Sequence, residues 1–377
     1  MQVLFDYQIF DAQKIGGISR YFCELARGSP EVKLGLSHTR NTHLLASEVA
    51  GIEGWPHKAG VGKLLEGANF PGANKLQRLH KRLGRDLDPD NRGISLDMLR
   101  SGRFDVFHPT YYDPYFLEAL GSKPFVLTIH DMIHELYPEL FESGDTTRQW
   151  KQVLASRASA IIAVSENTKR DIISYYDIDP SRIRVIYHGS DLGGRIPAAM
   201  EVPERYILFT GSRWGYKNFV FMVEALAPLL DKIPNVWIVC TGRPFTADES
   251  RLFRELGMDS KIIHRDAGDD EMYTLYSRAL FFIFPSYYEG FGIPILEAFE
   301  AGCPALVARS SSLPEVGGDA CLYFEPKDAA SLRAGAEALI ESAALRNSLA
   351  VKGRERVRQF SWERCRESTF RCYQELV

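Results

Sequence analysis

The stretch Pro285–Pro304, PSYYEGFGIPILEAFEAGCP, decides the architecture of this chain. An apolar run, Leu280–Phe284, leads into it and predicts a buried strand. A loop with glycines follows, and then a helix that Pro294 opens as its first residue. We expect this helix to carry Glu297 in its first turn and to stop near Gly302. This order of strand, loop and helix is typical of an open parallel sheet, in which ligands lie outside the carboxyl ends of the strands and beside helix N-termini.

Two glutamates, Glu289 and Glu297, stand eight residues apart in this stretch, one in the loop and one in the helix. Glu297 by itself could serve only to complement the helix dipole. A carboxylate at Glu289, between Tyr288 and Phe291 in a glycine loop, has little packing purpose. The flanking glycines let backbone come close to a ligand. The pair therefore predicts a binding site.

These residues resemble the E-x7-E signature of the retaining GT-B glycosyltransferases of family four, with EGFGIP, a glutamate eight positions on and AGCP after it. The resemblance covers nearly the whole chain and is strongest from residue 206 to 325. It implies an α/β fold in which two Rossmann-like, doubly wound parallel-sheet domains face a cleft. It also implies that a C-terminal helix crosses back to the first domain.

The length of the chain, 377 residues, fits two domains better than one hydrophobic core. GGRIPAAMEVPE, residues 193–204, is rich in Gly and Pro, lacks periodicity and predicts a linker. We therefore expect an acceptor-side domain over residues 1–192 and a nucleotide-sugar domain over 205–358. A break at Phe360–Trp362 marks a terminal helix, 359–377, that returns to the first domain.

Composition and charge exclude several classes of protein. A net charge of −4 argues against a general nucleic-acid binder. The six cysteines have no CxxC and no metal-ligand spacing, which indicates reduced thiols. No apolar run approaches the roughly 18 residues that span a bilayer, and MQVLFDYQIFDAQ lacks the basic start of a signal peptide. We expect a cytoplasmic protein.

The second domain opens with a strand, Tyr206–Thr210, followed by GSRWGYKN, residues 211–218. Arg213 and Lys217 flank this loop, and two cations at the carboxyl end of a strand could grip a diphosphate. The alternative is that Arg213 and Lys217 are ordinary surface charges that bind no ligand. The loop resembles the family motif in which this pair neutralises the leaving nucleoside diphosphate. The other donor-binding positions predicted here are Gly211, Arg265, Phe291, Gly292, Ile293 and Glu297.

The first domain contributes two further candidate features. His130 and Asp131 follow an apolar run, and they resemble the family motif whose histidine contacts the donor sugar. Gly16 and Gly17 precede a helical stretch; they form either an ordinary turn or the glycine loop that relatives turn toward the donor. His108 ends the preceding strand candidate and is a further site candidate.

A basic stretch within residues 51–93 predicts the acceptor or membrane side. Leu76, Leu79 and Leu83 would share one helical face, so a basic amphipathic segment could contact anionic lipid or the phosphate of a lipid-linked acceptor. The alternative is a solvated helix with its charges outward. The cations that we select are Lys75, Arg78, Lys81 and Arg82.

Together these features predict a hexosyltransferase of bacterial surface-polysaccharide assembly. It would act on a saccharide or polyprenyl-linked acceptor, at the inner face of the plasma membrane if the basic stretch binds lipid. HDMIHELYPELF and GSRWGYKN resemble mannosyltransferase-like enzymes, which favours GDP-mannose as donor. Glu289 would lie near the donor sugar and Glu297 at the ribose.

The chain has no DxD motif in a convincing setting, so we expect no metal and no cofactor beyond the sugar nucleotide. Three alternatives stay open: a UDP-sugar donor, a nucleotide-sugar hydrolase or epimerase, and a non-catalytic nucleotide-sugar-binding partner. A dinucleotide-dependent oxidoreductase is disfavoured because no G-x-G-x-x-G follows the first strand.

Overall fold

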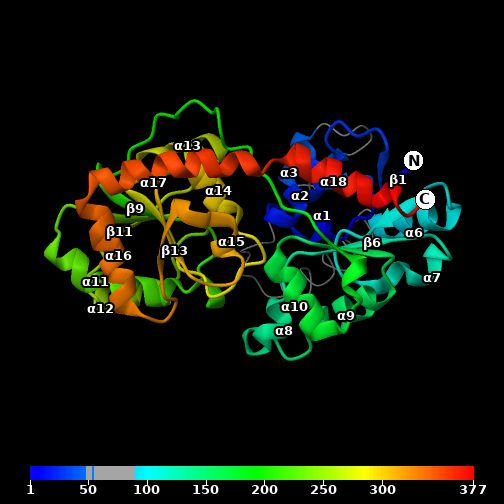
Figure 1. Cartoon of the computed structure of the whole chain (residues 1–377), viewed down its shortest axis with the longest axis horizontal. Helices are drawn as coiled ribbons and strands as arrows, with labels where there is room; N and C mark the ends of the chain where they lie inside the picture. The colour runs from blue at the N-terminus through cyan, green and yellow to red at the C-terminus, as the bar shows by residue number, and fades with distance from the viewer. Residues whose placement is uncertain (48–52, 55–89) are drawn as a thin grey trace, which may run out of the picture. The chain divides into compact units, whose positions relative to one another are not determined.

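The computed structural model describes residues 1–47, 53–54 and 90–377. The chain divides into two compact units, each with parallel strands linked by helices (Figure 1). Unit 1 comprises Met1–Thr128, Gln149–Ile161 and Phe370–Val377, and unit 2 comprises Ile129–Arg148 and Ile162–Thr369. The last residues of the chain therefore belong to the unit that contains the first ones, as predicted for a terminal helix that returns.

Unit 2 contains a six-stranded sheet in the order β11-β10-β9-β12-β13-β14. Its strands are β9 (Tyr206–Phe209), β10 (Trp237–Cys240), β11 (Ile262–His264), β12 (Phe281–Phe284), β13 (Ala305–Ala308) and β14 (Cys321–Phe324). All neighbours pair in parallel, and β9 pairs directly with β12 through Ile207 opposite Phe281. The strand order reverses between β9 and β12. This switch point brings together the loops that follow the two strands.

Helices cover both faces of this sheet (Figure 1). On one side lie α11 (Phe219–Lys232), α12 (Ala247–Glu255) and α16 (Ala329–Glu341); on the other lie α13 (Asp269–Arg278), α14 (Ile293–Glu300) and α17 (Ala343–Arg356). Shorter elements are η4 (Gly215–Lys217), α15 (Leu313–Gly317), η5 (Gly318–Ala320) and η6 (Val357–Gln359). Every residue of β9, β12 and β13 is buried, because a parallel sheet covered on both faces needs apolar strands throughout.

A second part of unit 2 comes from the first half of the chain. β6 (Val126–Ile129), β7 (Ala160–Ala163) and β8 (Ile183–Val185) form a sheet in that order, and the division between the units falls within β6 and β7. The accompanying elements are α8 (Ile133–Leu136), η2 (Pro138–Leu140), α10 (Glu166–Tyr176) and η3 (Pro180–Arg182). The Ser165 hydroxyl accepts the Thr168 N–H and caps α10.

Unit 1 is built on the parallel sheet β2-β1-β5, formed by β2 (Val32–Leu34), β1 (Val3–Phe5) and β5 (Val106–His108). Its helices include α1 (Gln8–Ala12), α2 (Gly17–Ala26), α3 (Thr42–Ala46), α6 (Asn91–Ser101), η1 (Pro114–Phe116) and α7 (Leu117–Leu120). Two short strands, β3 (His38–Thr39) and β4 (Glu53–Gly54), pair in parallel. The helices α9 (Thr147–Arg157) and α18 (Trp362–Gln374) each contain residues of both units.

Three predicted boundaries differ from the structure. Glu297 is the fifth residue of α14 and lies outside its first turn, because Gly292, with φ +108°, caps a helix that already begins at Ile293. The helix that follows the glycine pair starts at Gly17. The predicted terminal helix, 359–377, is shorter in the structure, where α18 spans Trp362–Gln374.

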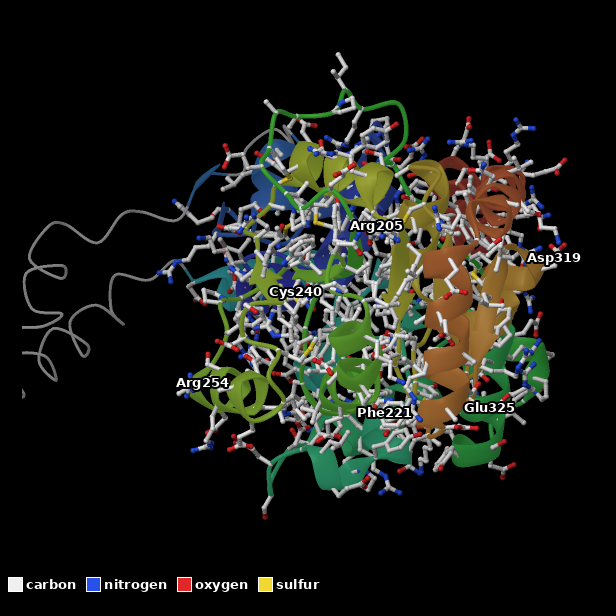
Figure 2. The ribbon with its side chains drawn as sticks, turned by 90° about the vertical axis from the view of Figure 1, so that its left-hand side faces the viewer. Arg205, Phe221, Cys240, Arg254, Asp319 and Glu325 are labelled. Carbon is white, nitrogen blue, oxygen red and sulfur yellow. The ribbon has the colours of Figure 1, made fainter. Side chains whose placement is uncertain are left out.

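All six cysteines are buried and lie outside any disulfide, and Figure 2 labels one of them, Cys240, in unit 2. Across the described ranges 1–47, 53–54 and 90–377, no helix combines the length and the apolar character needed to cross a bilayer.

Candidate functional site

The switch point of the unit 2 sheet brings two predicted catalytic side chains into contact. Lys217 ends η4 in the loop after β9, and Glu289 lies in the loop after β12. The Lys217 Nζ lies 2.7 Å from the Glu289 Oε1, and the side chains are only 20% and 13% exposed. Burial alone would lower the pKa of Lys217, but the attraction of Glu289 outweighs it, and the pKa lies above its ordinary value. The ammonium is therefore charged at neutral pH.

Three consecutive serines from the loop after β13 hold the Glu289 loop in place. The Ser310 hydroxyl donates to the Ser286 carbonyl at 2.8 Å. The Ser311 hydroxyl accepts the Glu289 N–H at 2.9 Å, and the Ser312 hydroxyl donates to the Glu289 carbonyl at 2.8 Å. The predicted site residues do not include these serines. A run of small hydroxyl residues directly after a buried strand was the signal available.

Gly290 lies against the backbone of His130. A Cβ atom at Gly290 would overlap the His130 carbonyl oxygen and would lie 2.7 Å from its carbonyl carbon, so only glycine fits. The Gly290 carbonyl also accepts the Thr168 hydroxyl at 3.1 Å. The Tyr288 hydroxyl, in the same loop, accepts the Met132 N–H. The predicted histidine and the predicted glutamate loop are therefore neighbours within unit 2, although His130 and Tyr288 are 158 residues apart in sequence.

The His130 ring stacks on the His188 ring with centroids 5.9 Å apart. Burial, reinforced by the nearby His130, holds the pKa of His188 well below its ordinary value, so His188 is neutral. The Asp131 carboxylate accepts the Ile133 N–H at 3.1 Å and thereby shapes the entry into α8. His130 is thus held by ring packing on one side and by the Gly290 loop on the other.

The N-terminus of α14 supplies backbone donors beside the ion pair. Gly292, at φ +108°, turns the chain into the helix, which begins at Ile293. The Phe291 side chain packs among aromatic rings, 5.1 Å from His188 and 5.8 Å from Phe360. Phe291 can therefore act on a ligand only through its backbone. The free N–H groups of a helix N-terminus favour a phosphate at this place.

Glu297 is held by a tyrosine that sequence reasoning missed. The Tyr276 hydroxyl donates to the Glu297 Oε2 at 3.1 Å and lies 3.2 Å from the Thr210 hydroxyl. Burial and the neighbouring Glu297 raise the pKa of Tyr276 well above its ordinary value, so its proton stays in place. The available signal was chemical, since a tyrosine on the buried face of a helix needs a polar partner.

Arg213 does not contact Lys217 or Glu289. Its side chain is only 2% exposed, and its Nε lies 2.6 Å from the Glu249 Oε1 on α12. The remaining donors bind backbone carbonyls of the loop after β10, namely those of Thr241, Arg243 and Pro244. Arg213 thus fastens the loop after β9 to the loop after β10.

Two other predicted donor positions lie at the same edge of the sheet. Gly211 follows β9 at φ +90° and is exposed. The Arg265 guanidinium, after β11, donates to the carbonyls of Glu201 at 3.2 Å and His264 at 3.0 Å. Its side chain therefore fastens the predicted linker, through Glu201, to the loop after β11.

The remaining predicted residues do not lie among those of unit 2. Gly16 and Gly17 open α2 in unit 1, with extended backbone at Gly16 and open space where a Gly17 side chain would project. His108 is fully buried in unit 1 between Tyr373 and Thr128 and is structural. Lys75, Arg78, Lys81 and Arg82 lie outside the described residues.

No group of three or more His, Cys, Asp or Glu side chains in the described part of the chain is arranged to hold a metal ion. What the site offers is a buried ammonium–carboxylate pair, a second carboxylate and a helix N-terminus, all within unit 2.

Comparisons with known proteins place this chain among glycosyltransferases. The family profile described as "Glycosyl transferases group 1" matches residues 197–356, and "Glycosyltransferase Family 4" matches residues 60–193. The chain is 30% identical over 297 residues to O-antigen chain mannosyltransferase B of Escherichia coli, covering 74% of this chain and 76% of that protein. It is 27% identical over 298 residues to the MMP α-(1→4)-mannosyltransferase of Mycolicibacterium hassiacum, covering 74% and 72%.

Among solved structures, Anabaena HepE in complex with UDP and glucose aligns over 100% of both chains, with a TM-score of 0.73 and 18% sequence identity. At this identity the likeness bears on the fold alone.

Proposed function

Because the chain belongs to the group 1 and family 4 glycosyltransferases, we propose that it transfers mannose from GDP-mannose, with retention, to a saccharide or lipid-linked saccharide acceptor. The chain is a glycosyltransferase, and the predicted GT-B fold with two Rossmann-like domains is confirmed. Relatives that are mannosyltransferases of the O-antigen chain support mannose and surface-polysaccharide assembly.

The observation that carries this proposal is the Lys217–Glu289 ion pair at the switch point, beside the N-terminus of α14. The donor diphosphate would lie against the Lys217 ammonium and the N–H groups of Gly292 and Ile293. Both are fixed before the reaction and face the place where negative charge develops on the leaving group. Glu297, oriented by Tyr276, would accept the ribose hydroxyls.

In the proposed reaction the acceptor oxygen approaches the anomeric carbon from the face that the phosphate leaves. The bond between that carbon and the phosphate oxygen breaks, the new glycosidic bond forms, and the acceptor proton passes to the departing phosphate oxygen. Glu289 stabilises the positive charge that develops on the sugar ring, and His130 contacts the sugar hydroxyls. The protein supplies fixed charges for both ends of the breaking bond, so we propose that no metal ion is needed.

Thermal shifts with GDP, UDP, ADP and dTDP, in the presence of EDTA and again with Mg²⁺, test the donor. A ligand at 100 times its dissociation constant stabilises the folded state by about 2.7 kcal/mol. We expect GDP to raise the melting temperature most, equally with and without Mg²⁺, and Lys217→Ala to abolish the shift. Lys232→Ala, which removes an exposed lysine from the end of α11, is the matched control and should keep it.

Transfer itself is tested with GDP-mannose, separating chemistry from binding. Glu289→Gln should lower kcat on the order of 100- to 1000-fold while the GDP shift is retained. A preference for UDP would move the proposal to a UDP-sugar donor. A GDP thermal shift with neither mannose transfer nor breakdown of GDP-mannose would favour a non-catalytic binding partner. Breakdown of GDP-mannose without transfer would favour a hydrolase.

We also propose that the acceptor lies at the cytoplasmic face of the membrane and that Lys75, Arg78, Lys81 and Arg82 contact anionic lipid there. Replacing all four by Ser should weaken sedimentation with anionic liposomes at low salt. Equal sedimentation of variant and parent would instead support the solvated helix.

A further inference from the structure

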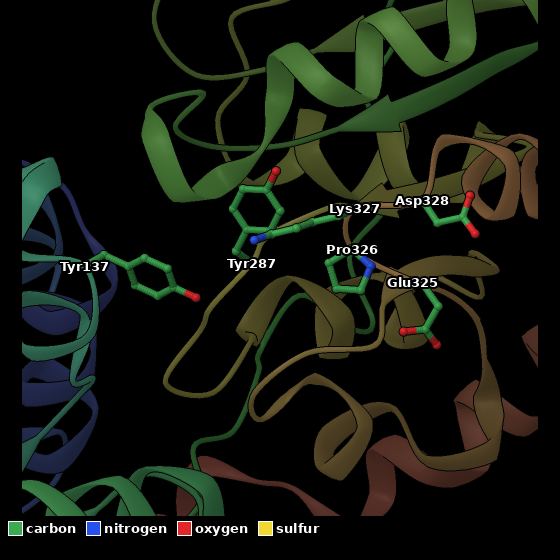
Figure 3. A pocket seen from close by; sticks show the side chains of 6 residues that line it. All are labelled: Tyr137, Tyr287, Glu325, Pro326, Lys327 and Asp328. Carbon is green, nitrogen blue, oxygen red and sulfur yellow. The ribbon is translucent and has the colours of Figure 1, made fainter.

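A cavity outside the predicted donor site opens on unit 2 at the carboxyl edge of the same sheet (Figure 3). Its volume is about 470 Å³, within the range of about 300–1,000 Å³ that is common for small-molecule sites. It is lined by Tyr137, Tyr287, Glu325, Pro326, Lys327 and Asp328. These residues come from the loops after β12 and β14 and from the segment between α8 and η2.

The walls of this cavity are fastened to the loop that carries Lys217. The Tyr287 N–H donates to the Tyr216 carbonyl at 2.8 Å, and the Asn218 side-chain amide donates to the Pro326 carbonyl at 3.1 Å. Tyr216 and Asn218 are the two neighbours of Lys217 in sequence, and Tyr287 precedes Glu289 by two residues. The cavity is therefore connected on two sides to the Lys217–Glu289 pair.

Aromatic faces and one cation dominate the lining. The side chains of Tyr137 and Tyr287 are both partly exposed. The Lys327 ammonium lies 5.7 Å from the centroid of the Tyr287 ring. In Figure 3 the Lys327 side chain runs along Tyr287 in the direction of Tyr137, and the Tyr137 side chain extends from the facing segment into the space below Tyr287. Within the described residues this ammonium has no carboxylate partner.

The two acidic residues of the lining already have partners. Glu325 forms an exposed ion pair with Arg309 at 3.4 Å. The Asp328 carboxylate accepts the N–H groups of Ala330 and Ser331 and caps α16. What remains for a ligand is a pair of flat aromatic rings, two phenol hydroxyls and an ammonium.

We propose that this cavity binds a pyranose ring of the acceptor saccharide, packed against Tyr287 and hydrogen-bonded by Tyr137 and Lys327. A pyranose presents a face of C–H bonds that packs on an aromatic ring, and its hydroxyls at the rim accept hydrogen bonds from phenols and ammonium groups. A single ammonium beside two carboxylates suits a neutral sugar better than a nucleoside diphosphate. The inference rests on the proposed function, since only a transferase needs an acceptor.

Saturation-transfer NMR with methyl α-D-mannopyranoside and methyl α-D-glucopyranoside tests the proposal on the full chain. We expect transfer to at least one glycoside, and we expect it to persist when saturating GDP is added. Tyr287→Ala should weaken glycoside binding about three- to tenfold, whereas Tyr287→Phe, which keeps the ring, should stay within about twofold of the parent. Tyr175→Ala is the control, because Tyr175 is an exposed tyrosine on α10.

GDP thermal shifts measured on the same variants keep this inference separate from the donor proposal. Tyr287→Ala should leave the GDP shift unchanged. The proposal is overturned if neither glycoside receives saturation, if GDP displaces the glycoside, or if Tyr287→Ala and Tyr175→Ala bind it equally. A lost GDP response with retained glycoside binding would instead contradict the proposed donor.

Discussion

Replacing Arg213 by alanine tests whether this residue stabilises the fold or binds the donor diphosphate. In the structure the guanidinium is almost fully buried and spans two loops of unit 2. Its Nε and Nη2 bind the two carboxylate oxygens of Glu249 at 2.6 and 3.3 Å. If these contacts are the role of Arg213, its loss must appear in the stability of the protein without any nucleotide.

The size of the effect follows from what the substitution leaves behind. Breaking a buried ion pair by removing one partner typically costs about 3–5 kcal/mol. Glu249 is 16% exposed and keeps its own bond from the Thr246 N–H at 2.7 Å, so water and this cap reduce the cost toward the lower end. We therefore expect Arg213→Ala to lower the free energy of unfolding by about 3 kcal/mol. For a unit of this size that is a fall in melting temperature of about 6–12 °C.

Differential scanning calorimetry of the ligand-free protein measures this fall. Arg251→Ala is the matched control. Arg251 lies on α12, the helix that carries Glu249, and forms an exposed ion pair with Asp248, so its loss should change the melting temperature by less than about 1 °C. A ligand-free melting temperature for Arg213→Ala within about 2 °C of the parent, together with loss of the GDP shift, would refute the scaffold role and support the diphosphate contact.

Three further predictions address other parts of the structure. Gly290→Ala should lower the free energy of unfolding by about 3 kcal/mol in urea titrations, since its Cβ meets the His130 backbone, whereas Gly17→Ala, which projects into open space, should be nearly neutral. Tyr276→Phe should weaken GDP binding about five- to tenfold in calorimetric titrations but leave binding of 2′,3′-dideoxy-GDP almost unchanged, because only the ribose hydroxyls use the oriented Glu297; equal losses for both nucleotides would contradict this role. Burial lowers the pKa of His108 to about 3, so below its ordinary pKa of 6.5 the unfolded chain binds a proton that the folded one does not, and stability should fall with falling pH by up to about 1.4 kcal/mol per pH unit. His108→Gln should flatten that slope between about pH 7 and pH 5, and an unchanged slope would exclude His108 as its source.

Local patterns in the sequence predicted the elements that they specify directly. The strands before GSRWGYKN and EGFGIP lie within one residue of the predicted ones. Apolar runs define buried strands because a covered parallel sheet needs them. The start of α14 was harder to predict from the sequence. It is set by the positive φ of Gly292, a conformation that glycine permits but does not require.

The tertiary partners of the site residues could not be predicted from the sequence, for a different reason. The sequence around Arg213 does not reveal whether its side chain binds a phosphate or a glutamate 36 residues away. The partnership of Tyr276 and Glu297 joins two helices through side chains that have no shared pattern. The cavity at Tyr287 arises because the strand order sets the loops after β12 and β14 at one edge of the sheet, and strand order cannot be read from any single stretch.

On the proposed function, the Lys217–Glu289 pair gives the donor site an internal counterion. A diphosphate that arrives there does not meet an unsatisfied cation; it exchanges one anionic neighbour of Lys217 for another, or shares the ammonium with it. Only the difference between the two partnerships contributes to affinity, so the ground-state complex is held more weakly than the charges alone suggest. When the spent nucleotide departs, Glu289 takes back the ammonium without bringing in solvent ions. On the proposed function, the pair thus eases product release and restores local neutrality at the end of each turnover.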